Sequence, residues 1–175
     1  MGRPLNIFIS YKRGEGDNIA REIENYLTRK KNFLVFRDVD KIEGGEDWNQ
    51  KITRSIKKSD IFILIVTSLA LTSEEVDKEV REAQRWNKRI LPCKLDIINL
   101  EKLKWNLGKL NILNYSEKNI SALLLSIDNS IDTFLYEKRK QSLKKGVSIA
   151  LPIVIIGFVT YIFLGYLLNP QIEVS

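Results

Sequence analysis

The residue best placed to carry chemistry is Glu79, which follows a long apolar run on a predicted helix. The run I-F-I-L-I-V after Asp60 is unbroken and rich in isoleucine, which predicts a strand covered on both faces in a parallel sheet. Val76 and Val80 then recur at helical spacing, and Ser73 is the expected N-cap of their helix. Ligands of open parallel sheets bind beyond the carboxyl ends of the strands, and Glu79 can face such a cleft. We therefore take Glu79 as the centre of the protein's chemistry.

The composition limits which reactions are available. The 175 residues include no histidine and one cysteine, Cys93. Ser-His-Asp and Cys-His catalysis are therefore excluded, as is a zinc site of the usual Cys/His type. Cys93 lies in an apolar, strand-like run, which favours a core thiol. Acid–base chemistry must come from carboxylates, lysine or tyrosine, and no metal site is predicted.

The net charge of +6 does not indicate a nucleic-acid-binding protein. Of the 28 basic and 22 acidic residues, five basic ones lie in residues 138–145 and one acidic one, Glu173, follows them. Residues 1–137 thus keep 23 basic and 21 acidic side chains. A domain so close to neutral lacks the basic surface that phosphate backbones require, so no nucleic-acid partner is expected.

Apolar periodicity predicts strands that alternate with helices along residues 1–137. This alternation indicates a parallel sheet of four or five strands with helices on both faces. The chain just before the helix of Glu79 is predicted to be a short loop, and Pro92 indicates an edge position or an irregularity in the fourth strand. The predicted strands are residues 6–10, 33–37, 61–66, 89–95 and 110–113, and the predicted helices are residues 19–31, 48–56, 76–83 and 120–134.

Three stretches combine polar residues with predicted strand ends or loops. Residues 8–13 (F-I-S-Y-K-R) end a strand in a hydroxyl, a phenol and two cations, which suits phosphate or ribose contacts. Residues 38–45 (D-V-D-K-I-E-G-G) form an acidic loop with a Gly-Gly hinge, and residues 68–79 lead to the helical glutamate. Taken singly, the three stretches favour explanations without a function: a solvated basic turn, an ordinary surface loop and a solvated helix face, respectively.

In this order, the three stretches resemble the Toll/interleukin-1 receptor (TIR) domain family. F-I-S-Y-K-R is similar to its opening box, and V-F-R-D-V-D-K-I-E-G-G-E-D-W is similar to its second box and BB loop. S-L-A-L-T-S-E-E-V-D-K-E-V-R-E-A resembles the segment that ends in the catalytic glutamate of NADase-type members, and R-I-L-P-C-K-L resembles the next strand. The resemblance covers about residues 6–115 and implies a flavodoxin-like α/β fold, with a five-stranded parallel sheet and flanking helices.

Enzymatic members of this family cleave the nicotinamide–ribose bond of NAD. The resemblance implies that Glu79 is the catalytic carboxylate, with NAD+ as substrate and no cofactor. One positioned anion can stabilise the oxocarbenium-like ribosyl centre without a general acid. Many members carry an aromatic residue where this chain has Glu75, so stacking on the substrate would have to come from Tyr11 or Trp105. The substrate-binding residues implied by the resemblance are Ser10, Tyr11, Arg13, Asp38, Glu43, Ser68 and Ser73.

Residues 146–168 differ in kind from the rest, because they are apolar and uncharged. About 20 such residues cross a bilayer as a helix, so we expect a single transmembrane anchor in contact with lipid. The basic residues 138–145 should hold the preceding domain, residues 1–137, in the cytoplasm. Residues 169–175 would form a short outer tail.

These features support three hypotheses about function. The leading one is a membrane-anchored NAD+ hydrolase that forms ADP-ribose or a cyclic ADP-ribose, as an immune or antiphage effector or signal generator activated by self-association. The second is a non-enzymatic adaptor, in which TIR–TIR contacts assemble signalling complexes. The third makes the membrane helix the effector, gathered into a pore by the assembled domains. No sensor domain is evident, which leaves room for a separate sensor protein.

Overall fold

The computed structural model describes residues 3–31, 33–37, 48–95, 105, 107, 112–115 and 119–168. The chain divides into two compact units, Met1–Ser130 and Ile131–Ser175, which are described separately. The predicted acidic loop, with Asp38 and Glu43, lies outside the described residues.

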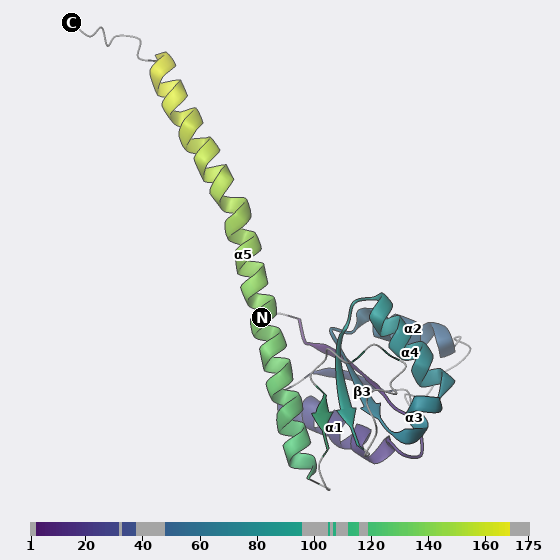
Figure 1. Cartoon of the computed structure of the whole chain (residues 1–175). Coiled ribbons are helices and arrows are strands. Elements are labelled where there is room, and N and C mark those ends of the chain that lie inside the picture. Colours follow the sequence, from purple (N-terminus) through teal and green to yellow (C-terminus); the bar gives the residue numbers. More distant parts are fainter. Residues whose placement is uncertain are drawn as a thin grey trace, which may run out of the picture. The chain divides into compact units, whose positions relative to one another are not determined.

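The first unit is built on a parallel sheet of five strands, as predicted, in the order β2-β1-β3-β4-β5. β3 lies at its centre (Figure 1) and is buried at all six positions, which confirms the prediction of a strand covered on both faces. A run without polar residues is stable only where both faces are removed from water. The strands are β1 (Asn6–Ser10), β2 (Leu34–Arg37), β3 (Ile61–Val66), β4 (Arg89–Lys94) and β5 (Leu113–Asn114).

Helices connect strands β1 to β4 and cover the sheet. Figure 1 places α1 on the opposite side of the sheet from α2 and α4, as the alternation of strands and helices predicted. The helices are α1 (Asp17–Lys31), α2 (Trp48–Lys58), α3 (Ser68–Thr72), α4 (Glu74–Arg85) and α5 (Ile120–Leu168).

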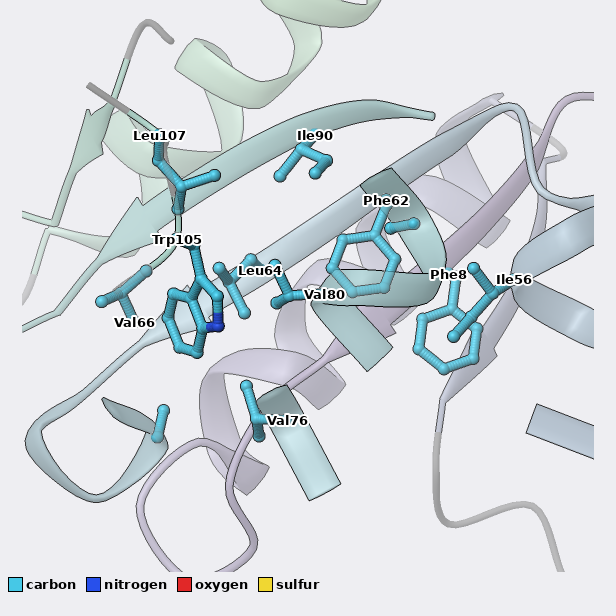
Figure 2. Packing of buried hydrophobic residues seen from close by; sticks show 12 residues of the cluster. Phe8, Ile56, Phe62, Leu64, Val66, Val76, Val80, Ile90, Trp105 and Leu107 are labelled. Atoms are coloured by element: carbon cyan, nitrogen blue, oxygen red, sulfur yellow. The ribbon is translucent and has the colours of Figure 1, made fainter. Parts of the chain in front are cut away.

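The core that supports the site lies between the sheet and helices α2 and α4. Phe8 of β1 stacks on Phe36 and on Phe62, each at 5.4 Å between ring centroids. Val80 of α4 and Ile56 of α2 are fully buried against the same cluster (Figure 2). Burial of side chains of this size stabilises a fold by about 1.5–3 kcal/mol each, so these contacts stabilise the packing of α4 against the sheet.

Two predicted segments of secondary structure differ from the structure. The expected loop before the helix of Glu79 contains the short helix α3, whose N-cap Thr67 accepts a hydrogen bond from the N–H of Ala70 at 3.1 Å. Helix α3 forms here because it buries Ala70, while the side chain of Thr67 satisfies the N–H of that residue. The fifth strand is Leu113–Asn114 rather than residues 110–113.

The edge position predicted from Pro92 is wrong, because β4 lies between β3 and β5. The carbonyl oxygen of Lys94 accepts a hydrogen bond from Tyr115 on the β5 side, at 2.9 Å. Backbone groups alternate sides along a strand, so the Pro92 nitrogen faces that same side. Among the residues that the structure describes, β5 pairs with Cys93 and Lys94 alone, so no described strand residue lies opposite the N–H that proline lacks.

The second unit contains the rest of α5, a helix of 49 residues that runs to Leu168. Within the part of the chain that the structure describes, no helix is both long enough and apolar enough to cross a membrane. The transmembrane helix predicted at residues 146–168 is therefore not confirmed. Apart from Leu164, the side chains of these residues lie outside the described part of the chain.

Candidate active site

Glu79 is held inside the domain rather than on a solvated helix face. Its residue is only 5% exposed, and its Oε2 accepts a hydrogen bond from Ser10 Oγ at 2.5 Å. Glu79 shares one stripe of α4 with Val76, Val80 and Ala83, at the spacing i, i+3, i+4, i+7 that marks a core-facing surface. The carboxylate is buried because α4 turns this whole stripe toward the sheet.

A pocket of about 480 Å³ opens beside this carboxylate, between α2 and α4. Glu79 forms part of its wall together with other charged side chains of α4, among them Glu75, Lys78 and Glu82. The lining residues on α2 are Asn49, Ile52, Thr53 and Ile56, none of which is charged. The pocket is large enough for part of a nucleotide, and pockets that combine apolar walls with a few polar groups are typical binding sites.

The first turn of α4 is fixed by a second set of polar contacts. Ser73 is the N-cap, as predicted, and its Oγ accepts a hydrogen bond from the N–H of Val76 at 3.3 Å. The same hydroxyl donates to Glu75 Oε2 at 2.7 Å, and Lys12 Nζ approaches that carboxylate at 3.3 Å. The Ser73 hydroxyl, followed by the backbone N–H of Glu75 and by Lys12, lowers the pKa of Glu75 from 4.5 to about 2. Glu75 is therefore a fixed negative charge at the pocket wall.

Two aromatic residues expected to stack on a ligand are part of the core. Tyr11 and Trp105 are each 3% exposed. Trp105 Nε1 donates a hydrogen bond to Asp77 Oδ1 at 2.8 Å, which joins residue 105 to α4. With both rings buried, the described side chains that line the pocket include no aromatic residue.

The structure does not bring the remaining predicted site residues together at the pocket. Arg13 and Ser68 are exposed, Arg13 between β1 and α1 and Ser68 at the start of α3, and neither lines the pocket. Ser10 contacts Glu79, whereas Ser73 serves as the helix cap. Of the predicted site residues that the structure describes, only Glu79 lines the pocket wall.

The pocket also contains residues that the sequence analysis did not single out. Asn49 and Thr53 share the stripe of Ile52 and Ile56 on α2, again at the spacing i, i+3, i+4, i+7. Polar residues within an otherwise apolar stripe are the signal that would have indicated them. The same signal marks Glu79 on α4.

A parallel sheet with a buried carboxylate and a pocket between its covering helices is typical of α/β domains that bind ligands. A family model described as the TIR domain matches residues 7–124. The chain therefore belongs to the TIR domain family, as its sequence motifs indicated.

Curated relatives with a known activity are similar over part of this domain. The chain is 29% identical over 100 residues to NAD(+) hydrolase sarm1 of Drosophila melanogaster, a match over 53% of this chain and 7% of that protein. It is also 29% identical over 100 residues to NAD(+) hydrolase tir-1 of Caenorhabditis elegans, over 53% of this chain and 10% of that protein. The chain thus spans only a small part of the length of these relatives.

The solved TIR domain of the Toll-related receptor TRR-2 of Hydra magnipapillata shares the fold. The two superpose with a TM-score of 0.59 at 13% sequence identity, over 73% of this chain and 98% of the receptor domain. At this identity the likeness concerns the fold alone.

Proposed function

We propose that this protein is a NAD+ hydrolase that cleaves the nicotinamide–ribose bond, with Glu79 as its catalytic carboxylate. The observation that carries the proposal is the burial of Glu79 at the wall of a pocket, in a domain similar to two NAD+ hydrolases. An unpaired surface glutamate needs no explanation, but a buried carboxylate beside a cavity is a strong candidate for function.

The reaction suits a chain without histidine. The bond between the ribose C1′ and the nicotinamide nitrogen breaks, and its electron pair leaves with neutral nicotinamide. The Glu79 carboxylate stabilises the positive charge that develops on the ribosyl group, in a site where water is partly excluded. Water then attacks C1′ and loses a proton, which yields ADP-ribose. Attack by an adenine nitrogen of the same molecule would give a cyclic product instead.

Positive charge for the substrate's diphosphate is available in the same pocket. Lys78 and Arg81 line it on α4, although Arg81 Nε is engaged by Asp77 Oδ2 at 3.0 Å. Lys78 is therefore our candidate for a phosphate contact, because an ammonium group pairs well with phosphate oxygens.

The decisive experiment replaces Glu79 by glutamine and measures nicotinamide release from NAD+ by chromatography. Glu79→Gln keeps the size of the side chain and an acceptor for Ser10 but removes the charge. We expect the rate to fall by about 10²–10³, as for the loss of other preorganised electrostatic groups. The midpoint of thermal unfolding should fall by no more than about 4 °C, because a neutral hydrogen bond to Ser10 remains and differs from the original by about 1 kcal/mol.

Two matched controls lie on the same helix and in the same pocket. Glu75→Gln and Glu82→Gln remove the same charge at positions that are more exposed than Glu79. We expect each of them to change the rate by less than about tenfold. If all three variants lose activity equally, the special role of Glu79 is wrong.

The absence of an aromatic residue among the described pocket walls favours a second candidate function, a non-enzymatic TIR adaptor. Here Glu75, bound to Lys12, occupies the position where many NADase-type members carry a ring. An adaptor would release no nicotinamide at any protein concentration, and complexes formed by the Glu79→Gln variant would match those of the wild type.

We further propose that activity depends on self-association of TIR domains, as in an immune effector or signal generator. Loop closure over an active site is a common requirement for turnover, and a neighbouring copy can supply it. Activity per molecule should rise steeply with protein concentration or on tethering to liposomes. A constant specific activity over a wide concentration range would contradict this.

The location we propose is the membrane, with residues 146–168 as a single-pass anchor and the TIR domain in the cytoplasm. Support comes from the sequence, since this segment carries no charge and follows the basic residues 138–145. Reporter fusions should place residue 1 inside and residue 175 outside. Recovery of the full chain in the supernatant after lysis without detergent would refute the anchor.

A further inference from the structure

We propose that Ser10 is a positioning residue that orients the Glu79 carboxylate and favours its ionised form, rather than a contact for the substrate. This inference rests on the proposed hydrolase function. Ser10 is fully buried at the carboxyl end of β1, and its Oγ lies 2.5 Å from Glu79 Oε2. A hydroxyl so enclosed reaches a ligand only through the carboxylate to which it donates.

The location of Ser10 in the strand explains why the two residues meet. Ser10 and Phe8 are two residues apart, so their side chains leave the same face of β1. Phe8 packs in the cluster that includes Val80, the residue next to Glu79 on α4. Ser10 therefore occupies a core-facing position beneath α4, where an apolar residue would be expected if packing were the only requirement.

The hydrogen bond has two consequences for the carboxylate. A short, charge-assisted bond between buried groups holds the side chain of Glu79 in one orientation. A donor also favours the ionised form, which is the form that stabilises a ribosyl cation. Among the described residues, the charged side chains that line the same pocket besides Glu79 are Glu75, Lys78, Arg81 and Glu82, all on α4, and the lining residues of α2 are uncharged.

The test uses the full chain and two serine-to-alanine variants. Ser10→Ala removes the donor to Glu79. Ser59→Ala is the matched control, because Ser59 is also buried, its Oγ donates to the carbonyl oxygen of Ile56 at 2.8 Å, and Ser59 itself neither lines the pocket nor contacts Glu79 in that bond. Both variants lose one buried hydrogen bond, so a purely structural role predicts similar effects on the two.

The first readout does not depend on turnover. Glutamate labelled with ¹³C at the carboxyl carbon is titrated by NMR, and the Glu79 signal is assigned by its loss in Glu79→Gln. We expect the midpoint of the Glu79 titration to rise by about one pH unit or more in Ser10→Ala and to stay unchanged in Ser59→Ala. An unchanged midpoint in Ser10→Ala would overturn the inference, whether or not the protein hydrolyses NAD+.

The second readout is the dependence of kcat on pH. We expect Ser10→Ala to lower kcat about 10- to 100-fold and to move the acid limb of the profile to higher pH, while Ser59→Ala leaves the profile in place. Ser10→Thr keeps a hydroxyl and should restore the wild-type profile; if its added methyl group prevents folding, the two alanine variants decide alone. Identical profiles for Ser10→Ala and the wild type would overturn the positioning role. A wild type that releases no nicotinamide would instead refute the proposed function and leave the titration as the test.

Discussion

Ser73 performs two tasks with one hydroxyl, and a series of substitutions can separate them. Its Oγ accepts a hydrogen bond from the N–H of Val76, which caps α4, and donates one to the carboxylate of Glu75. Ser73→Ala removes both contacts, and Ser73→Thr keeps both. Ser73→Asp keeps an oxygen that can cap the helix but removes the donor and places a second negative charge beside Glu75.

The two tasks have different expected magnitudes. Loss of an N-cap typically costs about 1 kcal/mol, which corresponds to about 4 °C in the midpoint of thermal unfolding for a domain of this size. Ser73→Ala should therefore unfold at a lower temperature, and Ser73→Asp should stay close to the wild type at neutral pH. Glu75 should titrate higher than about 2 in both variants, since the Ser73 hydroxyl is the largest cause of its lowered pKa.

The lowered pKa also predicts how stability depends on pH. Because the folded protein holds Glu75 ionised below its usual pKa of 4.5, its contribution to stability is complete above that pH. The contribution is lost as the pH falls from 4.5 toward about 2. The Glu75 side chain is 71% exposed, so solvent screening keeps the effect small. Ser73→Ala should flatten this part of the profile.

Circular dichroism during heating measures the first effect, and NMR titration of Glu75 measures the second. The reasoning would be refuted if Ser73→Ala unfolded at the wild-type temperature, or if Glu75 still titrated near 2 without the hydroxyl. Equal unfolding temperatures for Ser73→Ala and Ser73→Asp would show that capping contributes little here.

Two further predictions concern residues around the site. A Cβ atom at Gly16 would lie 2.8 Å from Tyr11 Cβ, so Gly16→Ala should destabilise the domain by about 1–3 kcal/mol in urea unfolding, and an unchanged midpoint would mean that Tyr11 is not fixed in the core. Burial raises the pKa of the Cys93 thiol to about 12, so the folded protein should resist iodoacetamide at pH 8 and react only on unfolding. The folded-state pKa exceeds 9.0, so the contribution of Cys93 to stability is present below that pH and is lost between 9.0 and about 12; rapid alkylation of the native protein would contradict this.

Apolar periodicity was sufficient to predict most elements of the domain. The six-residue run of β3 and the valine stripe of α4 indicated a buried strand and an amphipathic helix, and both are present. Ser73 was also identified as a cap, because capping depends on residues only three positions apart. Helix α3 was missed because its five residues are too few to show a helical period.

The candidate site was predicted less completely, because a pattern along the chain indicates which face a residue occupies but not which residue it meets there. The sequence by itself determined the sheet, its covering helices and the presence of a glutamate on the valine stripe of α4. Only the tertiary structure decided that Glu79 is buried, that Ser10 donates to it and that Tyr11 packs in the core. Ser10 and Glu79 are 69 residues apart, and their contact depends on how α4 packs across β1. That packing is set by many side chains at once, from β1, β3, α2 and α4, and no short stretch of sequence contains it.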